Sequence, residues 1–280
     1  MKDGSISTSL QPGYILHYHE YQESGFIVEA FTLTHGRVAM MAKSARNSRP
    51  QVRALYQPFR PLLLSWVGAG DLRTLTGIEE CGAAIDLRDV RLACGYYINE
   101  LTMRLLGKGQ SQDQVFAYYA LAMSELEQTA ISYEVILRTF ELQLLDTLGV
   151  MPDLRHCTPD GAQVLAEREY FYHPANAVAV PVPGSAGLGL MKEKHRMNEY
   201  ALSAHGAGAN LSPSVHPDGT TPDNGVRVNG KTLLAMHDLD FSDKQVLGQC
   251  RTLMRHILRI QLGDRPLKSR ELFAALAANR

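Results

Sequence analysis

The chain has 280 residues, of which 45% are hydrophobic and 20% are charged, and its formal net charge is −1. This composition is that of a globular protein rather than a disordered or fibrous one, and the length suits one large domain or a few small ones. No apolar run approaches the roughly 20 residues of a membrane span, and residues 1–12 contain no signal-peptide core, so we expect a cytoplasmic protein.

The first part of the chain alternates apolar and polar residues, as strands do. The alternating segments are Tyr14–Glu20, Phe26–Leu33, Arg37–Lys43, Leu62–Val67 and Leu72–Gly77. Turn residues separate them, so residues 1–82 are predicted to form a small five-stranded barrel after a flexible leader at 1–11. An oligonucleotide-binding barrel is the obvious candidate, although an SH3-like barrel has a similar pattern.

Residues 35–64 form a strongly basic stretch, and no acidic residue lies between Glu29 and Asp71. Alternation places Arg37 and Lys43 on one strand face, and residues 44–53 are predicted to be a mobile loop. Such cations can bind a polyanion backbone by displacing its counterions, although a merely solvated basic loop fits the composition equally well. The residues predicted to contact such a polyanion are Arg37, Lys43, Arg46, Arg49, Arg53, Arg60 and Arg73, of which the last two could equally be structural.

After Ile85 the apolar period becomes that of helices. The segments 86–106, 112–128 and 132–148 each place apolar residues three and four positions apart, and Gly149 fits the end of the last helix. The first of these helices is predicted to share one face among Leu92, Tyr96, Asn99 and Met103, and the third among Leu137, Phe140, Leu144 and Leu148.

The rest of the chain is less regular. Residues 151–180 are hard to interpret, and residues 181–229 are rich in Gly, Pro, Ser, Ala and Asn, which predicts a long loop with at most a short helix at 192–202. A helix is predicted from Ser242, which opens a capping pattern, to Leu262, and a last helix from Arg270 to Ala278. The predicted fold class is therefore α+β, with a barrel over residues 1–82 and an α-helical domain over residues 83–280.

Charge is distributed unevenly along the chain. Residues 81–170 contain thirteen Asp or Glu against seven Lys or Arg, a difference of −6, whereas residues 251–280 contain two against seven, a difference of +5. Basic stretches on either side of an acidic middle suggest that both ends could supply cations to one anionic partner.

Short blocks spread along the chain carry a family resemblance. They are Gly36-Arg37-Val38, 42–46 (Ala-Lys-Ser-Ala-Arg), 55–64, 97–101 (Tyr-Ile-Asn-Glu-Leu), 140–145 (Phe-Glu-Leu-Gln-Leu-Leu) and 266–273 (Pro-Leu-Lys-Ser-Arg-Glu-Leu-Phe). Together, and in this order, they resemble the RecO family of bacterial recombination mediators. The resemblance implies an N-terminal oligonucleotide-binding barrel, an α-helical domain and a non-enzymatic role in recombinational DNA repair. It also implies binding and annealing of single- and double-stranded DNA, action with RecR and with the C-terminal tail of single-strand-binding protein, help in loading RecA, and association with the nucleoid.

The chain departs from part of the family at a possible metal site. Some members carry a four-cysteine zinc finger after the helix that contains Phe140. Here Cys157 stands alone and position 160 is Asp, so one thiolate remains for a tetrahedral site. We therefore expect no metal and no cofactor. The stretch 181–229 also looks longer than the family's usual connection.

Other chemical interpretations compete with simpler ones. His17 and His19 share a strand face and could bind a metal, but strand histidines are more often surface residues. His156 beside Cys157 could suggest a nucleophile, but no third orienting residue is recognisable. The chain has no GxGxxG motif and no P-loop lysine, so no nucleotide cofactor is expected. Three aromatic residues could stack on bases or equally belong to the core: Tyr14, Tyr18 and Phe26.

The leading hypothesis is a DNA-binding and annealing mediator without catalysis, and the alternative is a protein-interaction adaptor whose helical domain binds a peptide tail. A metal-dependent nuclease is disfavoured, because the basic stretch lacks carboxylates to hold the metal. An acidic tail with an apolar end needs cations around an apolar pocket, which Met254 and Leu258 could form. The predicted tail-binding residues are Arg138, Arg251, Arg255 and Arg259, which could instead only neutralise acidic helices.

Overall fold

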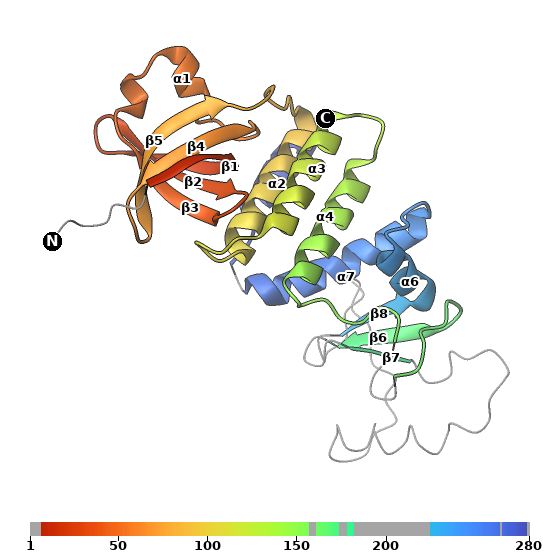
Figure 1. Cartoon of the computed structure of the whole chain (residues 1–280). Helices are drawn as coiled ribbons and strands as arrows, with labels where there is room; N and C mark the ends of the chain where they lie inside the picture. Colours follow the sequence, from red (N-terminus) through yellow and green to blue (C-terminus); the bar gives the residue numbers. More distant parts are fainter. Residues whose placement is uncertain (1–6, 157–160, 174–177, 182–224, 264, 279–280) are drawn as a thin grey trace, which may run out of the picture. The chain divides into compact units, whose positions relative to one another are not determined.

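The computed structural model describes residues 7–156, 161–173, 178–181, 225–263 and 265–278. The chain divides into two compact units, one formed by residues 1–147 together with 261–280 and the other by residues 148–260. The first unit contains a barrel and helices, and the second contains a small sheet and helices (Figure 1).

A closed five-stranded barrel forms the N-terminal part of the first unit, in the order β1-β2-β3-β5-β4. β1 is long enough to pair with both β2 and β4, and a parallel pairing of β3 with β5 completes the closure. The predicted oligonucleotide-binding barrel is thus confirmed. The strands are β1 (Ser7–Tyr21), β2 (Gly25–Thr32), β3 (Gly36–Ala42), β4 (Leu62–Val67) and β5 (Leu72–Glu80).

Strand alternation decides which side chains fill the barrel. On β3, Val38 and Met40 point into the core, which also contains Trp66. Tyr14 and Phe26 are only 8% and 6% exposed, so they are packed residues rather than open stacking platforms. β1 already begins at Ser7, so the prediction of a flexible leader is wrong for residues 7–11, while residues 1–6 lie outside the described residues.

Helices pack directly on the outside of the barrel. Phe31 of β2 contacts Phe116 and Tyr119, with ring centroids 5.4 and 5.9 Å apart. Asn99, which is buried, donates from its side chain to the Leu16 carbonyl at 2.9 Å, and Tyr119 donates to the Asn99 side chain at 2.7 Å. Apolar packing and a fully satisfied polar link therefore join the barrel to the helices α2 (Asp89–Leu105) and α3 (Asp113–Glu127).

The other helices of this unit are α4 (Tyr133–Thr147), which packs on α3, and α8 (Ser269–Ala278), which packs on α2. The face predicted for α4 is confirmed at Leu137, Phe140 and Leu144, which are buried. The face predicted for α2 is wrong at Tyr96, which is 39% exposed, because the tyrosine that turns inward is Tyr97. In the described part of the chain, none of the helices is sufficiently long and apolar to span a membrane.

The second unit contains a sheet that the sequence did not predict. Its strands are β6 (Glu169–His173), β7 (Val178–Pro181) and β8 (Val226–Asn229), in the order β7-β6-β8. The unpredicted α6 (Gly230–Asp238) and the predicted α7 (Lys244–Leu262) follow. Most of the predicted long loop, residues 182–224, lies outside the described residues, together with its possible helix at 192–202.

Candidate nucleic-acid interface

The basic segment between β3 and β4 is folded onto the barrel. It forms a short 3-10 helix, η1 (Ala45–Asn47), and one helical turn, α1 (Pro50–Ala54), so the predicted mobile loop is wrong there. Ala45 and Tyr56 are buried in the barrel core, and the Arg46 backbone donates to the Ser24 carbonyl at 2.9 Å. The backbone is therefore held in place, while the intervening polar side chains face outward.

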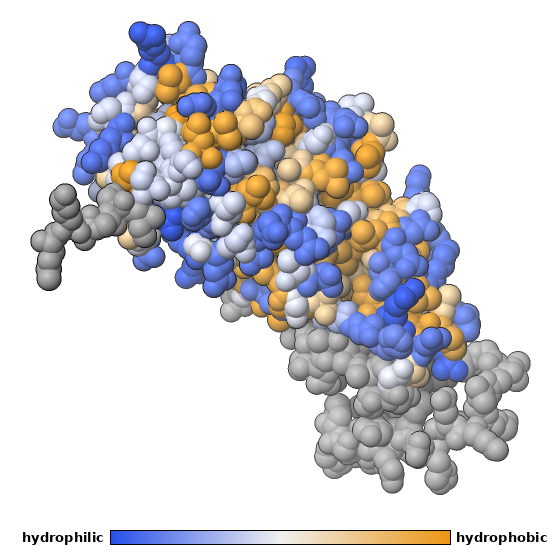
Figure 2. Space-filling model, viewed as in Figure 1, coloured by the Kyte–Doolittle hydropathy of each residue, from blue (hydrophilic) through white to orange (hydrophobic). Residues whose placement is uncertain are grey.

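Four cations of this segment, Lys43, Arg46, Arg49 and Arg53, form a group that we call the loop cations. Lys43, Arg49 and Arg53 are exposed and, among the described residues, make no ion pair. Arg46 lies 3.2 Å from a Glu20 carboxylate oxygen, and both side chains remain open to solvent. Hydrophilic side chains gather around α1 (Figure 2). The exposed loop cations add positive charge to this solvent-accessible surface.

Arg37 does not belong to this surface. Its guanidinium donates to the carbonyls of Met103 and, at 2.7 Å, Leu106, and pairs with Glu29 at 3.3 Å. Carbonyls at a helix C-terminus lack partners within the helix and carry partial negative charge, so the partly buried Arg37 stabilises the end of α2. The side chain is only 12% exposed. We therefore remove Arg37 from the predicted DNA-binding residues.

Arg60 and Arg73 have structural partners, which favours the second of the two roles predicted for them. Arg60 pairs with Glu80 at 3.0 Å, next to the end of β5. The Arg73 guanidinium carbon lies 5.7 Å from the centre of the Trp66 ring, within the range of a cation–π contact. Neither side chain belongs to the loop cations.

The acidic partners of these arginines, Glu20, Glu29 and Glu80, lie outside the acid-free stretch and were therefore not predicted. Strand register offers a signal for Glu29. It pairs across the sheet with Ala39, and Arg37 lies two residues from Ala39 on the same face of β3. A register prediction would therefore have placed this carboxylate beside Arg37.

Arg138 is turned into the helical bundle, contrary to its predicted role on an open surface. Its side chain is 11% exposed and pairs with Glu141 at 2.5 Å. The Tyr97 hydroxyl donates to the same carboxylate oxygen, at 2.5 Å. Burial raises the pKa of Glu141, and the neighbouring Arg138 and Tyr97 oppose that rise. We therefore remove Arg138 from the predicted tail-binding residues.

The remaining predicted tail-binding residues lie on α7, and all three are exposed: Arg251, Arg255 and Arg259. The prediction that Met254 and Leu258 form an open apolar pocket beside these arginines is wrong. Met254 and Leu258 are 0% and 2% exposed, so they belong to the core and cannot line an open pocket. Ile260 of α7 is exposed, at 45%, and Leu247 and Leu262 of the same helix are partly exposed.

The histidines do not assemble a metal site in the part of the chain that the structure describes, where no group of three His, Cys, Asp or Glu could hold an ion. The rings of His17 and His19 are 6.3 Å apart. Partial burial, His19 and Lys268 together lower the pKa of His17. Cys157 lies outside the described residues, so the absence of a zinc finger stays a prediction.

Comparison with known proteins gives the ancestry of the chain. The family model described as "Recombination protein O N terminal" matches residues 6–83, and the model described as "Recombination protein O C terminal" matches residues 90–204. The chain is 34% identical over 270 residues to "DNA repair protein RecO" of Glaesserella parasuis serovar 5, which covers 96% of this chain and 97% of the relative. It is 35% identical over 262 residues to the protein of the same name from Nitrosospira multiformis, which covers 94% and 93% of the two chains. The chain contains an oligonucleotide-binding barrel with an exposed group of cations, followed by helices, and it is similar to these relatives over nearly its full length. It therefore belongs to the RecO family of DNA repair proteins.

Proposed function

We propose that this chain is a non-enzymatic recombination mediator that binds single- and double-stranded DNA and anneals complementary strands. The observation that carries the proposal is the group of loop cations on the barrel. Three of its members, Lys43, Arg49 and Arg53, make no ion pair among the described residues, so their charges are available to phosphates.

The loop cations would bind the DNA backbone rather than the bases. Phosphate contacts carry no sequence information of their own, and the buried Tyr14 and Phe26 offer no open ring on which a base could stack. Cations held between two strands reduce the repulsion of their phosphates, which lets complementary bases approach. Binding is therefore expected to depend strongly on salt and weakly on sequence.

The lack of catalysis is part of the proposal. Metal-dependent hydrolysis of a phosphodiester needs carboxylates that hold ions beside the bound backbone. Glu20, the carboxylate that contacts the loop cations, is paired with Arg46, and no metal-binding group forms within the described residues.

We also propose that the chain acts with RecR and with the C-terminal tail of single-strand-binding protein, and so helps to load RecA. The tail would contact α7, where Arg255 is exposed and Ile260 offers apolar surface. Titration of a fluorescent tail peptide tests this: Arg255→Ala is expected to weaken peptide binding and Arg138→Ala to act only through folding. If Arg255→Ala binds the peptide like the parent protein, the tail docks elsewhere.

Fluorescence anisotropy with labelled single-stranded oligonucleotides tests DNA binding. Lys43→Ala/Arg49→Ala removes two loop cations and leaves the Arg46–Glu20 pair intact. Each phosphate contact adds about 0.7 to the slope of log affinity against log salt for single strands, so this slope is expected to fall by about 1.4. The loss of affinity is expected to be similar for different sequences.

The control is Lys231→Ala/Lys244→Ala, which removes two exposed cations from α6 and α7, the first of which pairs with Asp243 at 2.6 Å. It lowers the total charge equally, so any effect of overall charge appears in both variants. A loop variant whose slope equals that of the control would show that the loop cations do not contact the DNA backbone.

A further inference from the structure

We propose that a second group of cations, where the barrel meets the helices of the first unit, binds the same DNA backbone as the loop cations. This junction surface consists of Lys108 and Lys268, with His17 and His19 beside them. The inference rests on the proposed function, because it extends the DNA path from the loop cations along the outer face of the barrel. It also gives the basic C-terminal region a role in contacting DNA.

Lys108 is attached to the barrel although it follows α2 in the chain. Its backbone bridges to Arg37 of β3, and the next residue, Gly109, donates to the Arg37 carbonyl at 2.9 Å. Its ammonium group lies 3.1 Å from a Glu29 carboxylate oxygen, while the side chain remains 44% exposed. A cation is thus held at the rim of the barrel, with room to contact a ligand.

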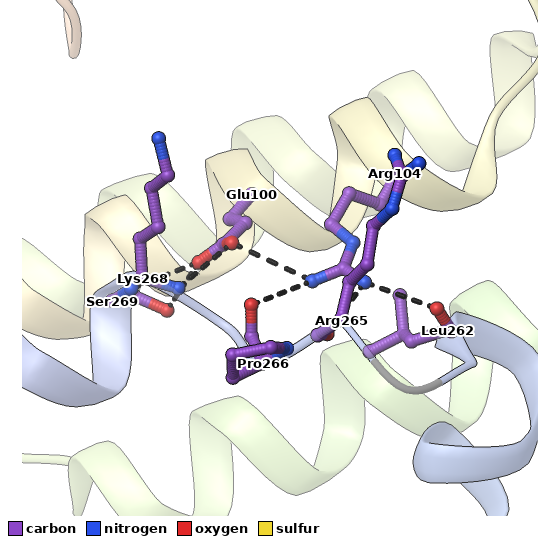
Figure 3. Close-up of polar contacts among 7 residues, drawn as sticks. All are labelled: Glu100, Arg104, Leu262, Arg265, Pro266, Lys268 and Ser269. Atoms are coloured by element: carbon purple, nitrogen blue, oxygen red, sulfur yellow. Dashed lines mark hydrogen bonds and ion pairs between the residues drawn. The ribbon is translucent and has the colours of Figure 1, made fainter.

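Lys268 is brought to the same place by a carboxylate on α2. Glu100 accepts hydrogen bonds from the backbone N–H groups of Lys268 and Ser269, both at 2.9 Å, and from the Ser269 hydroxyl at 2.8 Å (Figure 3). Only the backbone of Lys268 is used, and its ammonium group points away from these contacts. His17 of β1 is the register partner of Glu29, the carboxylate that pairs with Lys108, and the charge of Lys268 acts on the same histidine.

Arg104, one turn further along α2, fixes the other half of this turn. It donates to the carbonyls of Leu262 at 3.0 Å, Arg265 at 2.7 Å and Pro266 at 3.1 Å. Together, Glu100 and Arg104 form a clamp on five residues, which are Leu262, Arg265, Pro266, Lys268 and Ser269 (Figure 3). These hydrogen bonds restrain the backbone on either side of Lys268, which reduces the entropy that this lysine would lose on binding.

The two carboxylates of β1, β2 and β3 are paired, and the exposed Glu23, which makes no ion pair among the described residues, lies in the turn between β1 and β2 next to Ser24. Along β1, β2 and β3 the acidic residues are Glu20 and Glu29. Glu20 pairs with Arg46, and Glu29 pairs with both Arg37 and Lys108. A phosphate backbone that crosses these strands therefore meets neutralised carboxylates between two positive ends.

The spacing of the two groups suits a nucleic acid. η1 is anchored at Ser24 and the junction at Glu29, five residues apart on or next to β2. At about 3.3 Å per residue they are about 17 Å apart. Successive phosphates of one duplex strand advance about 3.4 Å along the helix axis, so a duplex whose axis runs parallel to the line between the two groups places about five of them over this distance.

An acidic peptide is the competing anionic partner, and the surface fits it less well. Peptide recognition combines charge with pockets for apolar side chains. Of the large apolar side chains that are exposed among the described residues, Val52 lies among the loop cations and Leu72 pairs with Ala39, the register partner of Glu29. None of these exposed apolar side chains is one of the four residues of the junction surface. A surface of spaced cations and imidazoles matches a phosphate backbone.

The test is Lys108→Ala/Lys268→Ala, measured by anisotropy with the same oligonucleotides, beside Lys43→Ala/Arg49→Ala and Lys231→Ala/Lys244→Ala. The clamp binds Lys268 through its backbone N–H, so the junction variant is expected to fold. If circular dichroism shows that the junction variant does not fold, the single variant Lys268→Gln is measured instead. We expect the salt slope to fall by about 1.4 for single strands, as in the loop variant. Because the two groups are far apart, the losses in log affinity should add when both pairs are removed.

The outcomes separate the inference from the function on which it rests. A junction variant that matches the control while the loop variant binds weakly would overturn the junction surface and leave the proposed function intact. A parent protein without salt-dependent DNA binding would overturn both. If a polyglutamate peptide binds the parent and loses affinity for the junction variant, while DNA binding is unchanged, the surface belongs to an acidic protein instead.

Discussion

Arg104→Ala is expected to destabilise the first unit by about 3 kcal/mol. The change removes all three hydrogen bonds from Arg104 to the turn at 262–266, one of them partly buried and two exposed. A hydrogen bond to a charged group contributes about 1.5–3 kcal/mol, and solvent reduces an exposed one to about 1 kcal/mol or less. About 1.5 kcal/mol for the first bond and slightly less than 1 kcal/mol for each of the others give the total.

The assay is urea denaturation followed by fluorescence of Trp66, the one tryptophan of the chain, which is 1% exposed in the barrel core. Its emission reports on the unit that contains the clamp. Arg104→Lys keeps the charge but lacks the planar fork that reaches several carbonyls, so its loss of stability should be intermediate. The control is Arg88→Ala, next to the start of the same helix, where the guanidinium pairs with the exposed Asp86.

The control is expected to unfold at the same urea concentration as the parent protein. If Arg104→Ala also unfolds there, the three carbonyls are as well satisfied by water as by the guanidinium. The clamp would then not hold the C-terminal turn, and the preorganisation invoked for Lys268 would be wrong.

Three further predictions concern other parts of the first unit. Burial raises the pKa of Glu141, so the contribution of this group to the free energy of unfolding falls as pH rises above the ordinary glutamate range. Glu141→Gln should reduce this pH dependence when urea midpoints are compared at mildly acidic and mildly alkaline pH. Gly36→Ala should destabilise by more than the ~1 kcal/mol of a simple glycine replacement, measured by thermal unfolding, because φ is +59° and a Cβ would lie 1.8 Å from the Gln110 carbonyl oxygen. Burial raises the pKa of Cys94 to about 12, so mass spectrometry after brief native alkylation should find the exposed Cys81 modified and Cys94 unmodified, and equal labelling would contradict this.

The alternation of apolar and polar residues predicted those strands whose defining residues are adjacent in the chain. β4 was predicted with the bounds Leu62–Val67 that it has, because its alternating apolar residues and flanking turn residues are adjacent in the chain. The sheet of the second unit was missed, because β6 and β8 are short and pair across more than fifty residues of sequence. Strands of this length acquire their structure from pairing, which no window of sequence contains.

The candidate site was predicted in outline and not in its details. Sequence identified the basic segment, but could not tell that Arg37 stabilises carbonyls at Met103 and Leu106, which are more than sixty residues away in the chain. Arg138 was misplaced although its partner Glu141 lies three residues away on the same helix, because this spacing does not reveal that both side chains turn inward. Whether an arginine faces solvent depends on tertiary packing, and its charge alone does not reveal this.

The contacts that Phe31 makes with the helices, and that Asn99 makes with the barrel, have a consequence for local unfolding of this protein. The sequence suggests a division after residue 82, but a cut there would expose the aromatic ring of Phe31 and leave the Leu16 carbonyl without its donor. Burial of such a ring alone contributes about 1.5–3 kcal/mol. The backbone amides of β1 and of α2 should therefore exchange with deuterium through one shared opening event, with similar protection, rather than as two independent domains.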